Sequence, residues 1–194
     1  ALAAFHEERL SRIRARVAGA AGPGPLTWVH AFPGRWDCCW TAGRTGTGEF
    51  LDLVGARNMG AEIVPGPGGG AINLEQALAA APEVYIGTGS SEGAADEPGL
   101  ILGTGVGEDR ARASLRRVLA DRGLAAVPAV RAGRAHGLWN FLRASPINIA
   151  EIEVLARWTR PALFGDLAPR ATLDEINRRF AAVPFEGTYW IGLD

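Results

Sequence analysis

The chain has 194 residues, of which 47% are hydrophobic and 21% charged, and its formal net charge is −1. This length suits one well-buried domain better than two, and the charge balance lacks the basic excess of nucleic-acid-binding surfaces. No segment approaches the roughly 20 consecutive apolar residues that span a bilayer. The first residues do not read as a signal peptide, so we expect either a cytoplasmic protein or an exported one without its targeting segment. All 20 basic residues are arginine, which excludes mechanisms that need a lysine.

Helices and strands are predicted to alternate in the first half of the chain. Apolar residues recur at helical spacing over residues 2–17, and glycines and prolines then end that helix. Residues 26–32 have the apolar run of a buried strand, and a loop rich in tryptophan, arginine and glycine follows. A helix over 49–56 and a short strand over 61–64 complete this half.

The second half continues the alternation. Asn73 is a good N-cap for a helix that runs to Ala81 and stops at Pro82. The further elements that we expect, in chain order, are a strand at 83–87, a polar loop at 88–99, an edge strand or extended connection at 100–107, a helix at 109–121, two short strands or one strand broken by Pro128 within 125–139, a helix at 146–158 with Pro146 at its first position, a helix at 172–180 capped by Thr172, and a tail or short strand from 187. This order predicts a three-layer, Rossmann-like α/β domain with a largely parallel sheet. Ligands of such sheets bind outside the carboxyl ends of the strands.

The glycine-rich run that begins at Pro65 loosely fits the Gly-x-Gly-x-x-Ala form of the dinucleotide fingerprint. That fingerprint needs an acidic residue at the end of the next strand to hold the ribose. The next strand here ends in Ile86-Gly87-Thr88-Gly89, and no acid follows until Glu92 in the loop beyond it. A P-loop is excluded because Gly-Lys-Ser/Thr is absent, and Pro65 and Pro67 lack the amide protons that would cradle a phosphate. The sequence therefore argues against a nucleotide site here.

No catalytic or metal-binding constellation is evident. Cys38 and Cys39 are adjacent and are the only cysteines, which makes them a poor zinc ligand set. We interpret them as two small, partly buried side chains, with a vicinal disulfide as the alternative in an oxidising compartment. His6, His30 and His136 are scattered, and neither Gly-x-Ser-x-Gly nor His-Glu-x-x-His occurs. We expect no enzyme, no catalytic residues and no metal ligands.

Three segments together resemble a known family. They are FLDLVGARNMGAE at 50–62, INLEQALAAAPEVYIGTG at 72–89, and the stretch from VRAGRAHGLW to RPALF at 130–164. They look like the C-terminal lobe of the periplasmic substrate-binding proteins of ABC importers for iron–siderophores, haem and cobalamin, the class III type with a helical backbone. Agreement covers residues 26–180. The chain departs from the family's Gly-Gly-x-Asn, where Ala56-Arg57 replaces the usual glycine.

The resemblance implies a division of the chain and a function. Residues 1–20 would be the end of the helix that joins two lobes, and 21–194 the C-terminal α/β lobe. The ligand would be a chelated metal, in the form of a ferric siderophore, haem or a corrinoid, and it would bind between the two lobes. The protein would need no cofactor. The protein would be periplasmic and would dock to an ABC permease and its ATPase. It would bind no nucleic acid and would meet the membrane only through the permease or a lipid anchor outside this chain.

The resemblance also selects site residues. Glu75, in Leu-Glu-Gln, stands where the family's C-terminal lobe presents a glutamate to permease arginines, although a first-turn glutamate also simply stabilises a helix. Tryptophan offers stacking area and arginine a charge-assisted fork for such chelates. The ligand-binding candidates come from the two most aromatic loops, and we expect about half of their aromatic rings to pack beneath the loops instead: Arg35, Trp36, Trp40, Arg44, Trp139, Phe141 and Arg143.

Three alternatives stay open at this stage. One is a stand-alone α/β enzyme or nucleotide-binding domain. Another is a receptor for bare Zn²⁺ or Mn²⁺, to which His30 and His136 would contribute. The third is a scaffold-type interaction domain that shares the fold, as in chelatase- or nitrogenase-like proteins.

Overall fold

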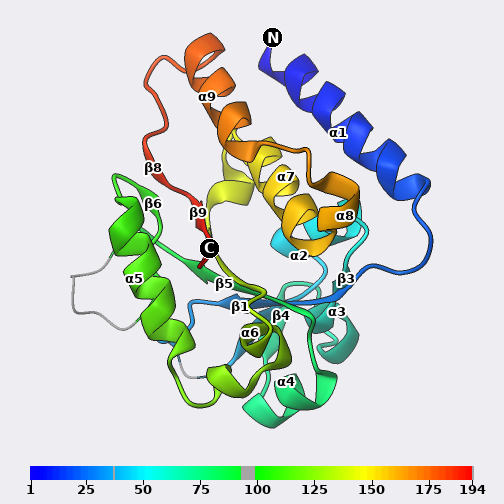
Figure 1. Ribbon diagram of the computed structural model, residues 1–194, viewed down its shortest axis with the longest axis vertical. Helices are drawn as coiled ribbons and strands as arrows, with labels where there is room; N and C mark the ends of the chain where they lie inside the picture. The colour runs from blue at the N-terminus through cyan, green and yellow to red at the C-terminus, as the bar shows by residue number, and fades with distance from the viewer. Residues whose placement is uncertain (37, 93–98, 194) are drawn as a thin grey trace.

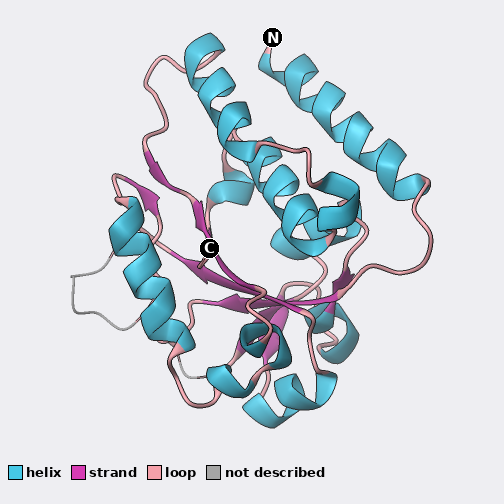
Figure 2. Cartoon of the chain, viewed as in Figure 1, coloured by secondary structure: helices cyan, strands magenta, loops and turns pink. Residues whose placement is uncertain are grey.

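A central β-sheet with helices on both faces forms the molecule (Figures 1 and 2). The computed structural model describes residues 1–36, 38–92 and 99–193. The helices on one face are α1 (Leu2–Ala18), α2 (Thr47–Leu53), α7 (Asn148–Thr159), α8 (Pro161–Phe164) and α9 (Pro169–Arg179). Those on the other face are α3 (Met59–Ile63), α4 (Leu74–Ala80), α5 (Glu108–Leu119) and α6 (Pro128–Arg131). This is the three-layer α/β architecture that the sequence predicts. None of the described helices is long and apolar enough to cross a membrane.

The sheet is parallel at its centre and antiparallel at its edges. Its strands lie in the order β4 (Gly69–Ala71), β2 (Trp40–Ala42), β1 (Leu26–Ala31), β5 (Val84–Gly89), β7 (Ala135–Trp139) and β9 (Trp190–Ile191), with β3 (Arg57–Asn58) beside the start of β1. Strand β5 pairs in parallel with both β1 and β7, whereas β2, β4 and β9 pair antiparallel. A separate pair joins β6 (Gly103–Thr104) to β8 (Gly187–Thr188). Antiparallel edge strands thus border the predicted parallel core.

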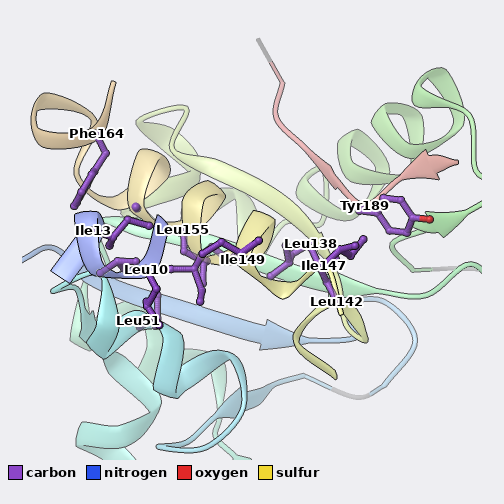
Figure 3. Close-up of a cluster of buried hydrophobic side chains, with 14 of the residues drawn as sticks. Leu10, Ile13, Leu51, Leu138, Leu142, Ile147, Ile149, Leu155, Phe164 and Tyr189 are labelled. Carbon is purple, nitrogen blue, oxygen red and sulfur yellow. The ribbon is translucent and has the colours of Figure 1, made fainter. Parts of the chain in front are cut away.

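Burial on both faces explains the apolar runs of β1 and β5. Val29 and Ile86 face the α7 side of the sheet, and Trp28 and Tyr85 face the α5 side. Because helices cover both faces, neither strand can alternate apolar with polar residues. Figure 3 shows the core on the α7 side, to which α1, α2, α7 and α8 contribute, with side chains that include Leu10, Ile13, Leu51, Leu155 and Phe164.

Helix α1 lies against α7 and α2 on one face of the sheet (Figure 1). Its apolar residues Phe5, Leu10 and Ile13 are buried. Arg9 adds polar contacts, with its guanidinium 3.0 Å from Glu153 on α7 and 2.9 Å from Glu175 on α9. The helix predicted over 2–17 is therefore confirmed, and it is an integral part of the packed domain.

Local capping chemistry sets the limits of α4. The Asn73 side chain accepts from the backbone N–H of Gln76 at 2.8 Å, and the Gln76 side chain accepts from the Asn73 N–H at 2.9 Å. This reciprocal capping box satisfies two amide groups that a helix start leaves without partners. The helix ends where Ala81 adopts a left-handed φ of 52°, next to Pro82. The predicted limits are confirmed.

Two expected strands are helical in the structure. The strand expected at 61–64 is wrong, because the Asn58 side chain caps α3 by accepting from the N–H groups of Gly60 and Ala61. The strand expected around Pro128 is also wrong, because a 3₁₀ turn at Leu124–Ala126 leads into α6, which begins at Pro128. Proline suits this first helical position since its missing N–H would have no partner there.

Two helix starts lie elsewhere than expected. Pro146 stands two residues before α7, which begins at Asn148. Helix α9 begins at Pro169, so Thr172 lies inside it and does not cap it. The Thr172 hydroxyl instead donates to the buried carboxylate of Glu153 at 2.5 Å. Because this hydroxyl faces the core, it bonds to a residue distant in sequence. A local capping pattern cannot predict such a contact. Of the loop expected at 88–99, the first two residues belong to β5, and 93–98 lie outside the described residues.

Candidate ligand-binding site

A cavity of about 200 Å³ lies at the carboxyl ends of the central strands. Ala31 ends β1 there, Thr88 stands near the end of β5, and Asn140 follows β7 directly. This is where parallel α/β sheets place ligands, because the loops that leave neighbouring strands meet at this edge. The residues that line it are Val29, Ala31, Phe32, Trp36, Trp40, Ala42, Thr45, Gly46, Thr47, Gly68, Thr88, Asn140 and Arg143.

Three aromatic rings follow one another along one wall. The ring centroids of Phe32 and Trp36 are 4.7 Å apart, and those of Trp36 and Trp40 are 6.2 Å apart. A tight turn sets this spacing, since the Trp36 N–H donates to the Phe32 carbonyl at 3.2 Å and Phe32 has a φ of 48°. Trp36 is 51% exposed and Trp40 is 40% exposed. Tryptophan faces open to solvent can stack on a flat or apolar ligand.

Polar groups at the ends of two neighbouring strands also line the cavity. The Thr88 hydroxyl donates to Asn140 Oδ1 at 3.1 Å, and the Asn140 N–H donates to the Gly89 carbonyl at 2.8 Å. These bonds fix the Asn140 side chain at the cavity. Its amide can therefore offer a preset donor to a ligand oxygen.

Arg143 supplies positive charge to the cavity. Its side chain is exposed and passes over Gly46, where an added Cβ would stand 3.1 Å from Arg143 Nε. Gly46 also has a φ of +67°. Glycine is thus needed for both the backbone shape and the close passage of the guanidinium. The fork of Arg143 is placed to bind a carboxylate or another anionic ligand group.

A buried acid lies behind the cavity wall. Glu151, on α7, is fully buried, and its Oε1 accepts from the Thr47 hydroxyl at 3.1 Å. Its Oε2 has no hydrogen-bond partner among the described residues. Burial raises the pKa of Glu151 to about 8, against the lowering effects of the Thr47 hydrogen bond and of the charge on Arg143. At neutral pH the side chain is therefore mainly a neutral carboxylic acid.

The glycine-rich run packs against the aromatic loop. Thr45 donates to the Pro67 carbonyl through its N–H at 3.0 Å and through its hydroxyl at 3.1 Å. A Cβ on Gly43 would stand only 2.5 Å from the Gly69 nitrogen, so a side chain there would force the two loops apart. Gly68 lines the cavity. The run therefore supplies a wall of the candidate site through close backbone packing.

The structure brings together three of the seven predicted ligand-binding residues, Trp36, Trp40 and Arg143. Arg35 instead donates to the Ser90 hydroxyl at 3.1 Å, and the exposed Arg44 is not among the lining residues.

The other two predicted aromatic residues lie outside the cavity. Trp139 is half-buried, with its ring 5.3 Å from Tyr189 and 5.8 Å from Phe141, while Phe141 is 51% exposed. Sequence reasoning missed Phe32, Thr88, Asn140 and Glu151. Thr88 and Asn140 stand at strand ends, a position that could have identified them. Glu151 has no such signal, since it lies within the apolar run of α7.

The histidine pair of the Zn²⁺/Mn²⁺ alternative does not form. His30 stacks on Trp28, on the α5 side of the sheet. His136 stacks on Trp158 of α7, on the opposite side, at a centroid distance of 4.3 Å. The two imidazoles cannot converge on one ion across the sheet.

No family model and no curated protein matches this chain. Among solved structures, a TroA-like periplasmic binding protein, FepB from Veillonella parvula, matches with a TM-score of 0.87 and 22% identity. The match covers 100% of this chain and 55% of that one. The chain has the TroA-like fold. The resemblance seen in the sequence is thereby confirmed at the level of the fold.

Two further periplasmic binding proteins match with lower TM-scores. A periplasmic haem-binding protein from Pseudomonas aeruginosa is 23% identical with a TM-score of 0.60, over 83% of this chain and 52% of its own. The molybdate-binding protein MolA from Haemophilus influenzae is 16% identical with a TM-score of 0.66, over 96% of this chain and 51% of its own. This chain thus spans about half the length of the structures that it matches.

Proposed function

We propose that this chain is the C-terminal lobe of a non-enzymatic solute receptor of an ABC importer, located outside the cytoplasmic membrane. Residues 1–20 would belong to the helix that joins it to a second lobe. The ligand would be a chelated metal, for example an iron complex or a corrinoid, held between the two lobes. The likeness to periplasmic binding proteins over about half their length supports this division.

The cavity at the strand ends carries the proposal. It combines an exposed aromatic row with one arginine, a chemistry that suits a large ligand with apolar faces and an anionic edge. At about 200 Å³ it would hold only part of such a ligand. The remainder would contact the second lobe.

Substitutions at the cavity test the ligand class. In a tryptophan-fluorescence titration of the full-length protein with haem, a ferric siderophore and a corrinoid, we expect one of them to bind. Arg143→Gln should weaken that binding roughly 10- to 100-fold, as expected for the loss of a charge-assisted hydrogen bond. Trp36→Ala should weaken it about 10-fold through lost stacking.

Two matched variants serve as controls. Phe141→Ala removes a ring that is as exposed as Trp36 but lies outside the cavity. Arg44→Gln removes an exposed arginine of the same loop region. Both should keep the wild-type affinity. With the Cys38–Cys39 disulfide intact, binding of free metal ions but of none of the chelates would refute the chelate proposal. Binding of a nucleotide would favour the α/β-enzyme alternative.

Glu75 is proposed to contact the permease. It is exposed in the first turn of α4, where the helix dipole stabilises a carboxylate and leaves it accessible to a cation. Glu75→Ala should abolish ligand uptake by cells while ligand affinity in vitro stays unchanged. Glu108→Ala, in the first turn of α5, is the control and should transport normally. A parallel loss of affinity in Glu75→Ala would argue against docking.

A further inference from the structure

The two cysteines and one histidine form a cluster that the sequence alone does not reveal. Cys38 and Cys39 are joined by a disulfide, with Cys38 exposed and Cys39 only 1% exposed. The vicinal disulfide is thus the form that the structure shows, rather than two separate buried thiols. Each of His30, Cys38 and Cys39 offers one ligand atom, and these three atoms lie within 4.8 Å of one another. Within the described part of the chain, this is the one group of three such residues close enough to hold a metal ion.

Strand pairing explains why His30 meets the cysteines. His30 pairs with Thr41 in the antiparallel ladder of β1 and β2. Cys39 stands two residues before Thr41, so its side chain belongs to the same face of the sheet and is a diagonal neighbour of His30. The backbone N–H and carbonyl of Cys39 both bond to Ile72, at 2.9 and 2.8 Å. The position of Cys39 is therefore fixed by the sheet.

His30 is prepared to act as a ligand. Its Nδ1 is 3.0 Å from the Tyr85 hydroxyl, and in the tautomer whose Nδ1–H donates to that oxygen the lone pair of Nε2 is open to an ion. Its ring stacks on Trp28 at 4.7 Å with an interplanar angle of 8°. Metal-binding histidines commonly have this arrangement, in which an oxygen partner on one ring nitrogen orients the other.

A pocket gives access to the cluster from solvent. It has a volume of about 310 Å³, and its wall includes His30, Cys38 and Trp36. Arg117 and Asp121 are the charged residues on the wall, so the pocket carries no net charge of its own. Thiolates and an imidazole select soft or borderline cations, and zinc prefers four N and S ligands in a tetrahedron. A water from the pocket can take the fourth position.

We propose that the reduced Cys38–Cys39 pair and His30 form a binding site for a zinc-like cation, and that the disulfide is the metal-free state of the same site. An external dithiol supplies two electrons and two protons, which break the S–S bond and give two thiols, while the dithiol closes to its own disulfide. The cation then displaces both thiol protons and forms two metal–sulfur bonds and one metal–nitrogen bond. This site stands independently of the proposed receptor function.

Zinc binding to the protein in its two redox states tests the proposal. The protein is reduced with a phosphine, its free thiols are counted, and Zn²⁺ is titrated against a chromophoric zinc indicator. The reduced protein should bind one Zn²⁺ per chain, and the oxidised protein should bind none with comparable affinity. Cd²⁺ in place of Zn²⁺ should give a thiolate charge-transfer band in the ultraviolet, which reports sulfur ligation directly.

Variants assign the ligands. Cys38→Ser, at an exposed position that should not disturb folding, and His30→Gln should each weaken zinc binding roughly 100-fold. Tyr85→Phe, which removes only the partner of Nδ1, should weaken it about 10-fold. His6→Gln changes a histidine on α1 that bonds to Asn148, and it should bind as the wild type does. Each variant's circular dichroism spectrum checks the fold.

Three results would overturn the proposal. One is a disulfide that no reductant opens in the folded protein. Another is reduced wild-type protein that does not bind Zn²⁺. The third is a Cys38→Ser/Cys39→Ser double variant that binds Zn²⁺ as tightly as the wild type.

Discussion

The free energy of unfolding of the wild type is expected to fall as the pH rises from 5 to 8, and Glu151→Gln should remove most of this fall. The unfolded chain releases the proton near the ordinary pKa of 4.5, whereas burial holds the pKa in the folded state at about 8. As pH rises through this window, the unfolded state ionises first, so the free energy of unfolding falls. The stabilisation is complete below pH 4.5 and is lost by about pH 8, and it amounts to roughly 4–5 kcal/mol at about 1.4 kcal/mol per pKa unit.

Urea unfolding of the two proteins at several pH values measures this effect. The difference in unfolding free energy between Glu151→Gln and wild type should shift in favour of the variant as pH rises. His30, with its pKa lowered to about 4, destabilises the folded state below pH 6.5 in both proteins, so its effect cancels in the difference. Glu75→Gln changes an exposed carboxylate and should parallel the wild type. Parallel curves for Glu151→Gln would contradict a buried, protonated acid.

Glu151 also connects stability to the candidate site. Thr47, whose hydroxyl bonds to Glu151, lines the candidate cavity, as does Arg143, whose charge acts on the same carboxyl group. At neutral pH the protonated Glu151 carries no negative charge, so it does not neutralise the Arg143 guanidinium. The positive charge at the cavity is then available to an anionic ligand group.

Removing the positive charge of Arg9 is expected to cause a large loss of stability. Its guanidinium is 3.0 Å from Glu153, which is only 1% exposed. In Arg9→Met this carboxylate stays buried with Thr172 as its remaining hydrogen-bond partner. Breaking such a buried pair costs about 3–5 kcal/mol. For a chain of this size, each kcal/mol lowers the melting temperature by roughly 2–4 °C, so a fall of about 10 °C is expected.

The same substitution one turn further along α1 provides the control. Arg12 pairs with Glu8 at 3.3 Å, but both side chains are mostly exposed, at 59% and 71%. Arg12→Met should therefore cost no more than about 0.5 kcal/mol. Adding Glu153→Gln to Arg9→Met should restore part of the lost melting temperature because no buried charge then lacks a partner. Equal effects of Arg9→Met and Arg12→Met, measured by calorimetry, would show that Arg9 is not buried in this way.

Local patterns predict the elements of this fold well where the deciding contacts are near in sequence. The helical spacing of residues 2–17, the capping box at Asn73 and the apolar run of β1 all act over a few residues, and the structure confirms each of them. The errors at 61–64 and around Pro128 also arise locally. At both places a local helix signal decides, namely the Asn58 cap of α3 and the proline at the start of α6.

The candidate site was only partly predictable. The rule that ligands lie at strand ends led to Trp36, Trp40 and Arg143, which do line the cavity. The same rule does not distinguish an arginine that faces the cavity from Arg35, which turns to Ser90. That choice depends on side chains about 55 residues away along the chain, as the separation of this pair shows.

The sequence by itself determined the α/β class, the alternation of helices and strands, and the absence of a phosphate-binding loop, because periodicity, caps and missing residue types act locally. Only the tertiary structure decided which side chains meet. It placed His30 beside Cys38 and Cys39 through the pairing of two strands, and it buried Glu151 behind the cavity. The pKa of a carboxyl group and the ligands around an ion depend on desolvation and on distances of a few ångströms, and packing alone sets those.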